Sequence, residues 1–263
     1  MGGGRTFEWP HLIDPGADPV FPDGLEPDEH GLIAVGGALS ERILVEAYGK
    51  GIFPWFVGPP IMWFSPDPRL VLYPSRFHLS RRLARTVRQA RYQVEFDRDF
   101  ERVMIHCAAV PRKHEEGTWI DRHFLTGYSR LHRRHITHCV STYLDGELCG
   151  GLYGLTLGRV FFGESMFALR PDASKVAFYH LVRWLDRRGF RFIDCQVRTE
   201  HLVSLGAEEI PRDRFLRELH EALQAPSHHY PWRDDPEAGR PDGARPEATR
   251  PGDARPEAGE GAR

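Results

Sequence analysis

The thirty residues HCVSTYLDGELCGGLYGLTLGRVFFGESMF, at positions 138–167, decide the fold. Asp145-Gly146 is a dipeptide that favours the tight type I′ turn of a β-hairpin, and Gly158 marks a second turn. These two turns divide the stretch into three segments. We therefore predict three consecutive antiparallel strands.

Helical and strand patterns alternate on both sides of these strands. The segment 173–188 carries Ala177, Leu181, Trp184 and Leu185 on one helical face. We further predict helices at 78–91, 121–134, 201–206 and 211–223, and a strand at 190–197. Together these elements predict an α+β catalytic domain over residues 68–225, with a mostly antiparallel sheet flanked by helices.

A smaller N-terminal domain is expected over residues 1–67. Its first thirty residues look irregular, and Ser40 then caps a short helix that ends at Gly49. The segment 51–69 holds five Pro and two Gly among three Phe and two Trp. Such a stretch is unsuited to a regular helix or central strand, yet it is too apolar for a solvated loop. We expect it to pack on a core or line a pocket.

The C-terminal residues 226–263 are predicted to form a disordered tail. Residues 234–263 include six Ala and no other hydrophobic residue, and Pro recurs every five residues. They also hold eight acids and five Arg and so carry −3, against −2 for the whole chain. The overall charge therefore excludes a histone-like basic protein, while a local basic patch remains compatible with it.

The sequence shows no secretory signal and no apolar run long enough to span a membrane, so we expect a soluble cytoplasmic protein, monomeric by default. Its four cysteines contain no C-x-x-C pair and are expected to be free thiols. We expect neither a metal nor another cofactor.

Nine strings occur in a fixed order: GLIAVGGALS, AYGKGIFPWF, WFSPDPR, GTWI, GGLYG, FFGESMF, ASK, IDCQ and HLVSLGAEEIPR. In this order and spacing the set resembles the bacterial leucyl/phenylalanyl-tRNA–protein transferase family, from about position 21 to 223. The resemblance implies a small N-terminal domain followed by a domain like the GNAT acyltransferases. It also implies transfer of Leu or Phe, and of Met less well, from aminoacyl-tRNA to proteins with N-terminal Arg or Lys. That transfer marks the acceptor for N-end rule (N-degron) degradation.

The candidate catalytic residues are Glu164, Asp194 and Gln196. If their segments are strands, period two places Glu164 with Met166 on one face and Asp194 with Gln196 on one face. The alternative is a hydrogen-bonded structural network. With the resemblance, we expect Gln196 to position the amine or ester, Asp194 to orient the Gln196 amide, and Glu164 to act as electrostatic partner or proton acceptor. Ser165 and Cys195 should face the other way, which disfavours an acyl-enzyme.

The donor's side chain and its 3′-terminal adenosine need separate surfaces. We expect Leu152, Phe161 (or Phe162) and Met166 to surround the apolar side chain, with ordinary core packing as the alternative. By the resemblance, Trp55 is the best candidate to stack on adenine. Tyr48, Trp119 and Tyr128 are expected around it. Phe64, Ser141 and Phe162 depart from the usual family residues and leave the order of preference among Leu, Phe and Met open.

The tRNA backbone needs cations, and the arginines of the helix at 78–91 are the candidates. Arg81, Arg85 and Arg88 share one helical face, and Arg76 and Arg82 extend the cluster. The alternative is a solvated helix face.

Two other functions stay open at this stage. One is an acetyl-CoA-dependent GNAT enzyme, although the sequence lacks the [QR]-x-x-G-x-[GA] loop that holds the pyrophosphate in such enzymes. The other is a non-catalytic binder of tRNA or of basic N-termini, which would not need the set of Glu164, Asp194 and Gln196.

Overall fold

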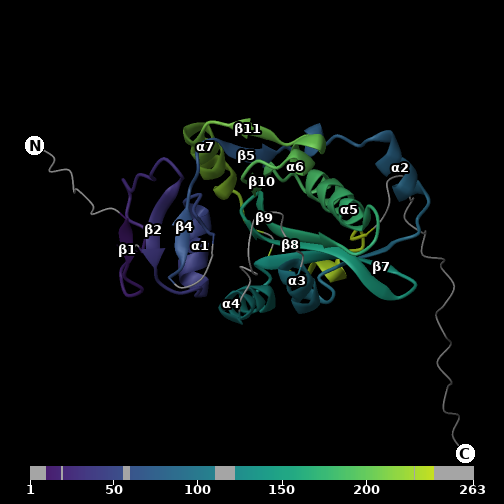
Figure 1. The fold of residues 1–263 in the computed structure, drawn as a ribbon, viewed down its shortest axis with the longest axis horizontal. Helices are drawn as coiled ribbons and strands as arrows, with labels where there is room; N and C mark the ends of the chain where they lie inside the picture. Colours follow the sequence, from purple (N-terminus) through teal and green to yellow (C-terminus); the bar gives the residue numbers. More distant parts are fainter. Residues whose placement is uncertain (1–9, 19, 56–59, 110–121, 228, 240–263) are drawn as a thin grey trace, which may run out of the picture.

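The computed structural model describes residues 10–18, 20–55, 60–109, 122–227 and 229–239 (Figure 1). A small sheet and one helix form the N-terminal part. A larger sheet with helices on both faces forms the rest (Figure 1). The α+β class, with a small N-terminal unit and a mostly antiparallel sheet flanked by helices, is confirmed.

The N-terminal sheet has four short strands in the order β1-β2-β4-β3: β1 (His11–Ile13), β2 (Leu32–Gly36), β3 (Phe53–Pro54) and β4 (Met62–Phe64). Helix α1 (Glu41–Gly49) begins at Ser40, whose side chain accepts a hydrogen bond from the Ile43 N–H, as expected of a cap. The apolar face of α1 is buried and includes Tyr48.

The second sheet has seven strands in the order β11-β5-β10-β9-β8-β7-β6. Its strands are β5 (Arg69–Leu72), β6 (Gln93–Phe96), β7 (Thr137–Leu144), β8 (Glu147–Leu157), β9 (Val160–Ala168), β10 (Phe192–Gln196) and β11 (Glu208–Ile210). The predicted three-stranded meander is β7-β8-β9, and both residues of the Asp145-Gly146 turn have positive φ, as a type I′ turn requires. Only the β9–β10 pair is parallel among these described strands.

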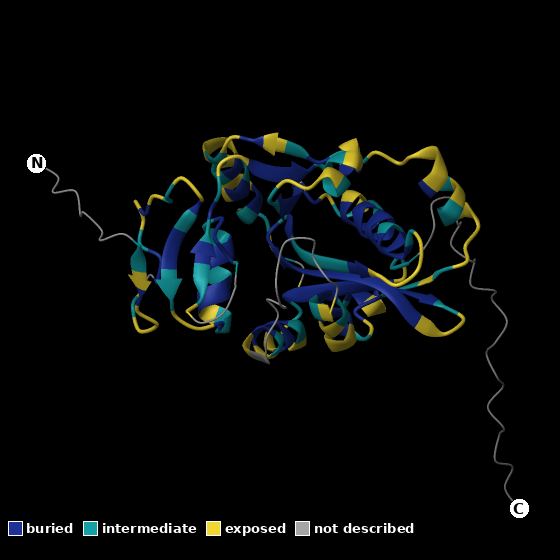
Figure 2. Ribbon diagram, in the orientation of Figure 1, coloured by how far each residue is buried: buried dark blue, intermediate teal, exposed yellow. Residues whose placement is uncertain are grey.

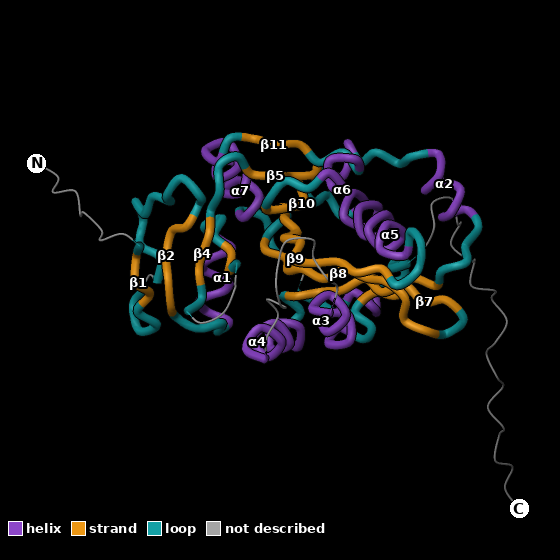
Figure 3. The backbone as a smooth tube through the Cα atoms, viewed as in Figure 1, coloured by secondary structure: helices purple, strands orange, loops and turns teal. Residues whose placement is uncertain are grey.

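The helices cover both faces of this sheet. Helix α5 (Ala173–Arg187) lies on one face, and α3 (Phe100–Ala109) and α4 (Arg122–Arg133) lie on the other (Figure 3). The remaining helices are α2 (Arg81–Arg88), α6 (Glu200–Ser204), α7 (Arg212–Leu223), η1 (Pro74–Arg76) and η2 (Trp232–Asp234). Strand β8 is buried along most of its length and β9 at its start, whereas α2 buries only Leu83 (Figure 2).

Two glycines of the GGLYG string permit close packing of the β-meander. A Cβ atom on Gly150 would lie 2.5 Å from the Ala173 Cβ atom of α5. A Cβ atom on Gly154 would lie 2.2 Å from the Phe162 carbonyl oxygen of the neighbouring strand. Both distances are far below van der Waals contact, so larger residues would push α5 or β9 away.

The boundaries differ from the prediction in two places. The helix predicted over 78–91 is shorter, because Ser80 caps it at its start and Ala90 has positive φ just after its end. The predicted tail starts too early: the described residues up to 239 pack on the domain, and Trp232 is fully buried. The prediction rested on the Pro repeat and the lack of large hydrophobic residues over 234–263, and Trp232 lies just before that stretch.

None of the helices in the described ranges is both long and apolar enough to cross a lipid bilayer. All four cysteines are free and buried.

Candidate active site

A pocket of about 450 Å³ opens where β9 and β10 separate. The two strands pair only as far as Phe162 and Asp194, and the residues that follow on each strand line the pocket instead. The other walls come from the end of β3, from β8, from α5 and from the start of α6. The lining is mostly apolar: Phe53, Trp55, Leu152, Phe161, Met166, Phe178, Ile193 and Leu202 contribute to it.

A β-bulge in each strand shapes the site. The pairing of β8 with β9 shifts by one residue between Gly163 and Ser165, which leaves Glu164 as the extra residue. The pairing of β10 with β5 shifts in the same way at Cys195, and Gln196 follows with φ of 62°. Strict alternation therefore fails at these two positions, and Ser165 and Cys195 line the pocket together with Glu164 and Gln196.

The bulge corrects one expectation. Period two placed Met166 on the same face as Glu164. In the structure Met166 packs with the apolar cluster under α5, whereas Glu164 reaches tyrosines from α1 and α4. The pocket still brings the two residues together because it opens at the strand edge.

Glu164 is the centre of a polar cluster. Its Oε1 atom accepts hydrogen bonds from the Tyr48 hydroxyl at 2.5 Å and from the Gln196 amide at 3.0 Å. Its Oε2 atom lies 3.2 Å from the Tyr128 hydroxyl, and the two hydroxyl oxygens are 2.6 Å apart. Three contacts among these oxygens share only two hydroxyl protons, so the cluster has room for one proton more.

Desolvation raises the pKa of Glu164 from 4.5 to about 7, against the opposing effect of the tyrosine and Gln196 hydrogen bonds, which stabilise the carboxylate. Burial and the Glu164 charge raise the pKa of Tyr48 well above its ordinary value, and the same holds for Tyr128. The tyrosines therefore remain donors near neutral pH, and Glu164 is the group of this cluster whose pKa lies near neutrality.

Asp194 lies behind this cluster in a buried ion pair with Arg69. The Arg69 Nε and Nη2 atoms donate to the two carboxylate oxygens at 2.8 and 2.6 Å, and both residues are inaccessible to solvent. The Asp194 Oδ1 atom also accepts from the backbone N–H of Gln196 at 2.9 Å. We expected Asp194 to orient the Gln196 side-chain amide; the structure gives it the backbone N–H, and the amide points to Glu164.

Arg69 and His201 were not predicted from the sequence as residues of the site. Arg69 begins the otherwise apolar segment RLVL of β5, and a single cation in a fully buried strand was the available signal. Its guanidinium group also lies over the rings of Phe53 and Phe215, at 4.7 and 4.5 Å. His201 of α6 lines the pocket, and burial lowers its pKa.

The predicted aromatic residues fall into two groups. Trp55 lines the pocket and packs edge-on against Phe64, with ring centroids 5.5 Å apart. Tyr48 and Tyr128 are fully buried, so their hydroxyl groups reach Glu164 while their rings offer no open face for stacking. The Phe162 ring packs edge-on against Tyr48, at 5.2 Å. Trp119 lies outside the described residues.

The arginines of α2 lie at the end of the molecule far from the N-terminal sheet (Figure 1). Arg76 pairs with Glu208 at 2.7 Å and Arg82 with Asp172 at 3.4 Å. Arg81, Arg85 and Arg88 are exposed, and within the described part of the chain they form no ion pair. The structure thus presents three uncompensated cations on one helix, away from the pocket.

An apolar pocket that ends at a carboxyl group with a raised pKa is typical of one class of protein, the enzymes that use proton transfer at their active site. Among the described residues no group of three or more His, Cys, Asp or Glu side chains is arranged to hold a metal ion.

Comparison with known proteins identifies the family. The leucyl/phenylalanyl-tRNA protein transferase family model matches residues 71–220, and the model of that family's N-terminal domain matches residues 37–67. A leucyl/phenylalanyl-tRNA–protein transferase of Nitrosospira multiformis is 55% identical over 195 residues, 74% of this chain and 84% of the relative. One of Desulfatibacillum aliphaticivorans is 52% identical over 220 residues, 83% of this chain and 94% of the relative. The chain belongs to the leucyl/phenylalanyl-tRNA protein transferase family and is an aminoacyltransferase that uses aminoacyl-tRNA and protein substrates.

Solved structures offer only remote likenesses. An aminoglycoside acetyltransferase from an uncultured soil metagenomic sample is 14% identical, with a TM-score of 0.34 over 44% of this chain and 84% of the other. A GCN5-related N-acetyltransferase-like protein of Streptococcus suis is 11% identical, with a TM-score of 0.32 over 67% of this chain and 68% of the other.

Proposed function

We propose that this protein transfers Leu or Phe, and Met less well, from aminoacyl-tRNA to the α-amino group of proteins that begin with Arg or Lys. In the cytoplasm this addition marks the acceptor for the N-end rule pathway. The observation that carries the proposal is the position of Glu164, which accepts a hydrogen bond from the Gln196 amide at the polar end of an apolar pocket. Burial there raises the pKa of Glu164 to about 7.

The pocket suits the donor's side chain. Leu152, Phe161 and Met166 line it together, and an apolar wall that includes a flexible Met accommodates side chains as different in shape as those of Leu, Phe and Met. Trp55 at the same pocket offers the aromatic surface on which a 3′-terminal adenine stacks.

Direct attack on the ester requires the acceptor's nitrogen to lose two protons. The α-ammonium group, with a pKa of about 8, first loses one proton to solvent. The nitrogen lone pair then attacks the ester carbonyl and a C–N bond forms, while the nitrogen gives its second proton to the Glu164 carboxylate. The C–O bond to the tRNA ribose breaks. The ribose oxygen leaves with the proton that Glu164 took. Gln196 positions the reacting groups from beside Glu164, and alignment of amine and ester supplies several kcal/mol of the barrier reduction.

A covalent acyl-enzyme is disfavoured, but the reason is not that Ser165 and Cys195 face away from the site. Ser165 and Cys195 do line the pocket, but burial raises the pKa of the Cys195 thiol far above neutrality. The hydroxyl of Ser165 would need an adjacent general base to become a nucleophile. The carboxyl group of Glu164 already accepts three hydrogen bonds, from Tyr48, Tyr128 and Gln196, and it serves the amine instead.

The transfer assay tests the proposal. Labelled Leu, Phe and Met on their tRNAs are offered to peptides beginning with Arg, Lys or Ala and to an N-acetylated Arg peptide, with protein of monomeric size confirmed by light scattering. We expect labelled peptide only from free Arg and Lys N-termini. Equal labelling of the acetylated peptide, or tRNA binding without any transfer, would overturn it. Acetyl transfer from acetyl-CoA alone would point to an acetyltransferase.

A further inference from the structure

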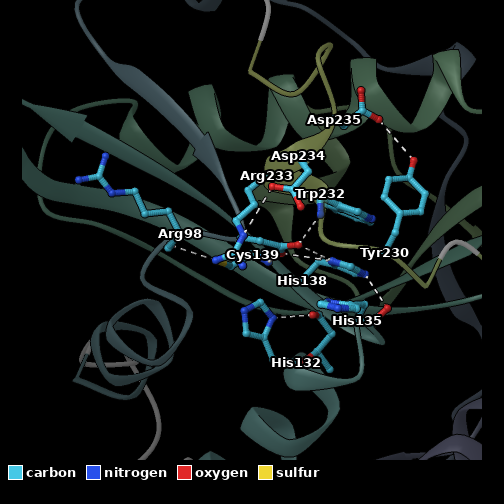
Figure 4. A network of polar contacts seen from close by, with 12 residues as sticks. Arg98, His132, His135, His138, Cys139, Tyr230, Trp232, Arg233, Asp234 and Asp235 are labelled. Atoms are coloured by element: carbon cyan, nitrogen blue, oxygen red, sulfur yellow. Dashed lines mark hydrogen bonds and ion pairs between the residues drawn. The ribbon is translucent and has the colours of Figure 1, made fainter.

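The segment 229–239, here called the C-terminal strap, inserts one tryptophan between α5 and the sheet. Trp232 is fully buried, and its ring stacks on His138 of β7 with centroids 3.9 Å apart and planes within 3° (Figure 4). It also packs against Trp184 of α5 at 4.2 Å and Phe161 of β9 at 6.0 Å.

Polar contacts of two carboxylates, Asp97 and Asp235, fix the strap in place. The Trp232 backbone N–H donates to the Asp97 Oδ2 atom at 2.7 Å, and the same carboxylate pairs with the His138 Nδ1 atom at 2.9 Å. Three residues further along, the Asp235 carboxylate accepts from the Trp184 indole at 3.3 Å and from Arg188. Trp232 is therefore held from its backbone as well as by its ring.

Phe161 connects the strap to the candidate active site. It lies between Trp232 on one side and the pocket on the other, and the same cluster under α5 includes the pocket residues Leu152 and Ile193. Interiors are close-packed, so the position of a wall residue depends on what fills the space behind it. The place of Phe161 in the pocket wall thus depends on Trp232.

We propose that Trp232 is a positioning residue that sets the depth of the aminoacyl pocket through Phe161, and thereby the relative use of Leu and Phe donors. The inference rests on the proposed function, because it takes the pocket as the site of the donor side chain. Trp232 lies beyond residues 71–220, the part of the chain that the family model matches. Donor preference would then depend on a residue outside that part.

The variants Trp232→Ala and Trp232→Phe test this role against a matched loss of core packing, Phe190→Ala. Phe190 is buried in the same cluster and packs on Trp184 at 5.9 Å, but it does not line the pocket. The readouts are the melting temperature, the kcat/KM for Phe-tRNA divided by that for Leu-tRNA, and the place of Phe161 in crystal structures. A merely structural loss lowers the kcat/KM for both donors by the same factor and leaves their ratio unchanged.

In Trp232→Ala, Phe161 should move into the vacated space and deepen the pocket. The ratio of Phe to Leu transfer should then rise about threefold or more, because one methylene group in an apolar pocket can change substrate discrimination by about 10-fold. Trp232→Phe should shift the ratio in the same direction by a smaller amount, and it serves in place of the alanine variant if that one fails to fold. Phe190→Ala should lower the melting temperature without moving the ratio.

The proposal is overturned if Phe161 stays in place, if the ratio is unchanged in both Trp232 variants, or if Phe190→Ala shifts it as much. If the wild-type protein transfers neither amino acid, the proposed function fails instead. In that case the pocket volume in the Trp232→Ala crystal structure still decides whether Trp232 determines the position of Phe161 in the pocket wall.

Discussion

Asp194 holds Gln196 by a hydrogen bond from the Gln196 backbone N–H, at 2.9 Å. Gln196 has φ of 62°, a conformation that costs a non-glycine residue about 1 kcal/mol or more. The ion pair with Arg69 fixes the Asp194 carboxylate. The β-bulge at Cys195 turns the side-chain amide of Gln196 toward Glu164. The buried pair therefore acts on the site through the backbone of one strand.

Replacing Glu164 by Gln removes the proton acceptor while keeping the side chain's shape. We expect kcat/KM for transfer to fall by about 10²–10⁴, the usual contribution of a general base, with tRNA affinity retained. Single-turnover transfer and filter binding measure the two effects. Glu200→Gln on α6 is the matched control, because Glu200 is exposed and lies outside the pocket lining. Loss of tRNA binding in Glu164→Gln would move Glu164 to a structural role.

The raised pKa of Glu164 predicts a pH dependence of stability. The unfolded chain loses this proton near pH 4.5, whereas the folded protein keeps it until about pH 7. The contribution of Glu164 to stability is therefore complete below pH 4.5 and declines as the pH rises to about 7. Urea unfolding across this range should show wild type losing stability relative to Glu164→Gln. A constant difference between the two proteins would contradict the raised pKa.

Removing the charge of Asp194 leaves Arg69 buried without a partner. We expect Asp194→Ala to destabilise the protein by about 3–5 kcal/mol, as breaking a buried ion pair does. The exposed pair of Arg76 and Glu208 gives the comparison: Glu208→Ala should cost less than about 1 kcal/mol. Denaturant midpoints measure both. Similar costs for the two variants would show that the buried pair adds little.

The free cations of α2 predict a salt-dependent affinity for tRNA. Replacing Arg81, Arg85 and Arg88 by Ala should weaken binding and reduce the slope of log affinity against log salt by about 2–3. A control removes three arginines that already have carboxylate partners, Arg198, Arg214 and Arg217. An equal change in slope for both triple variants would show that α2 is an ordinary solvated helix.

The sequence predicted the parts of the fold that depend on local chemistry. The Asp145-Gly146 turn, the Ser40 cap and the apolar face of the helix that became α5 each follow from a few neighbouring residues, and all were found. The insertion of β5 between β10 and β11 depends on pairing between distant segments, which no local pattern specifies.

The candidate site shows the same division. Glu164 and Gln196 were expected close together, and their side chains are hydrogen-bonded. Period-two reasoning misplaced Met166 because a bulge is a feature of two strands together and leaves no mark in one. The two tyrosine partners of Glu164 come from α1 and α4 and are eighty residues apart in the chain. Their contact with the carboxylate could therefore be found only in the tertiary structure.

The pH dependence of single-turnover transfer tests the central claim most directly, namely that Glu164 takes the amine's proton. Leu-tRNA and a saturating Arg-initiated peptide are used with wild type and Glu164→Gln. Both profiles should share an inflection of about 8 from the peptide's amine. Wild type should show a second inflection near 7, which belongs to Glu164, and the variant should lack it. The same inflection near 7 in both proteins would contradict the account.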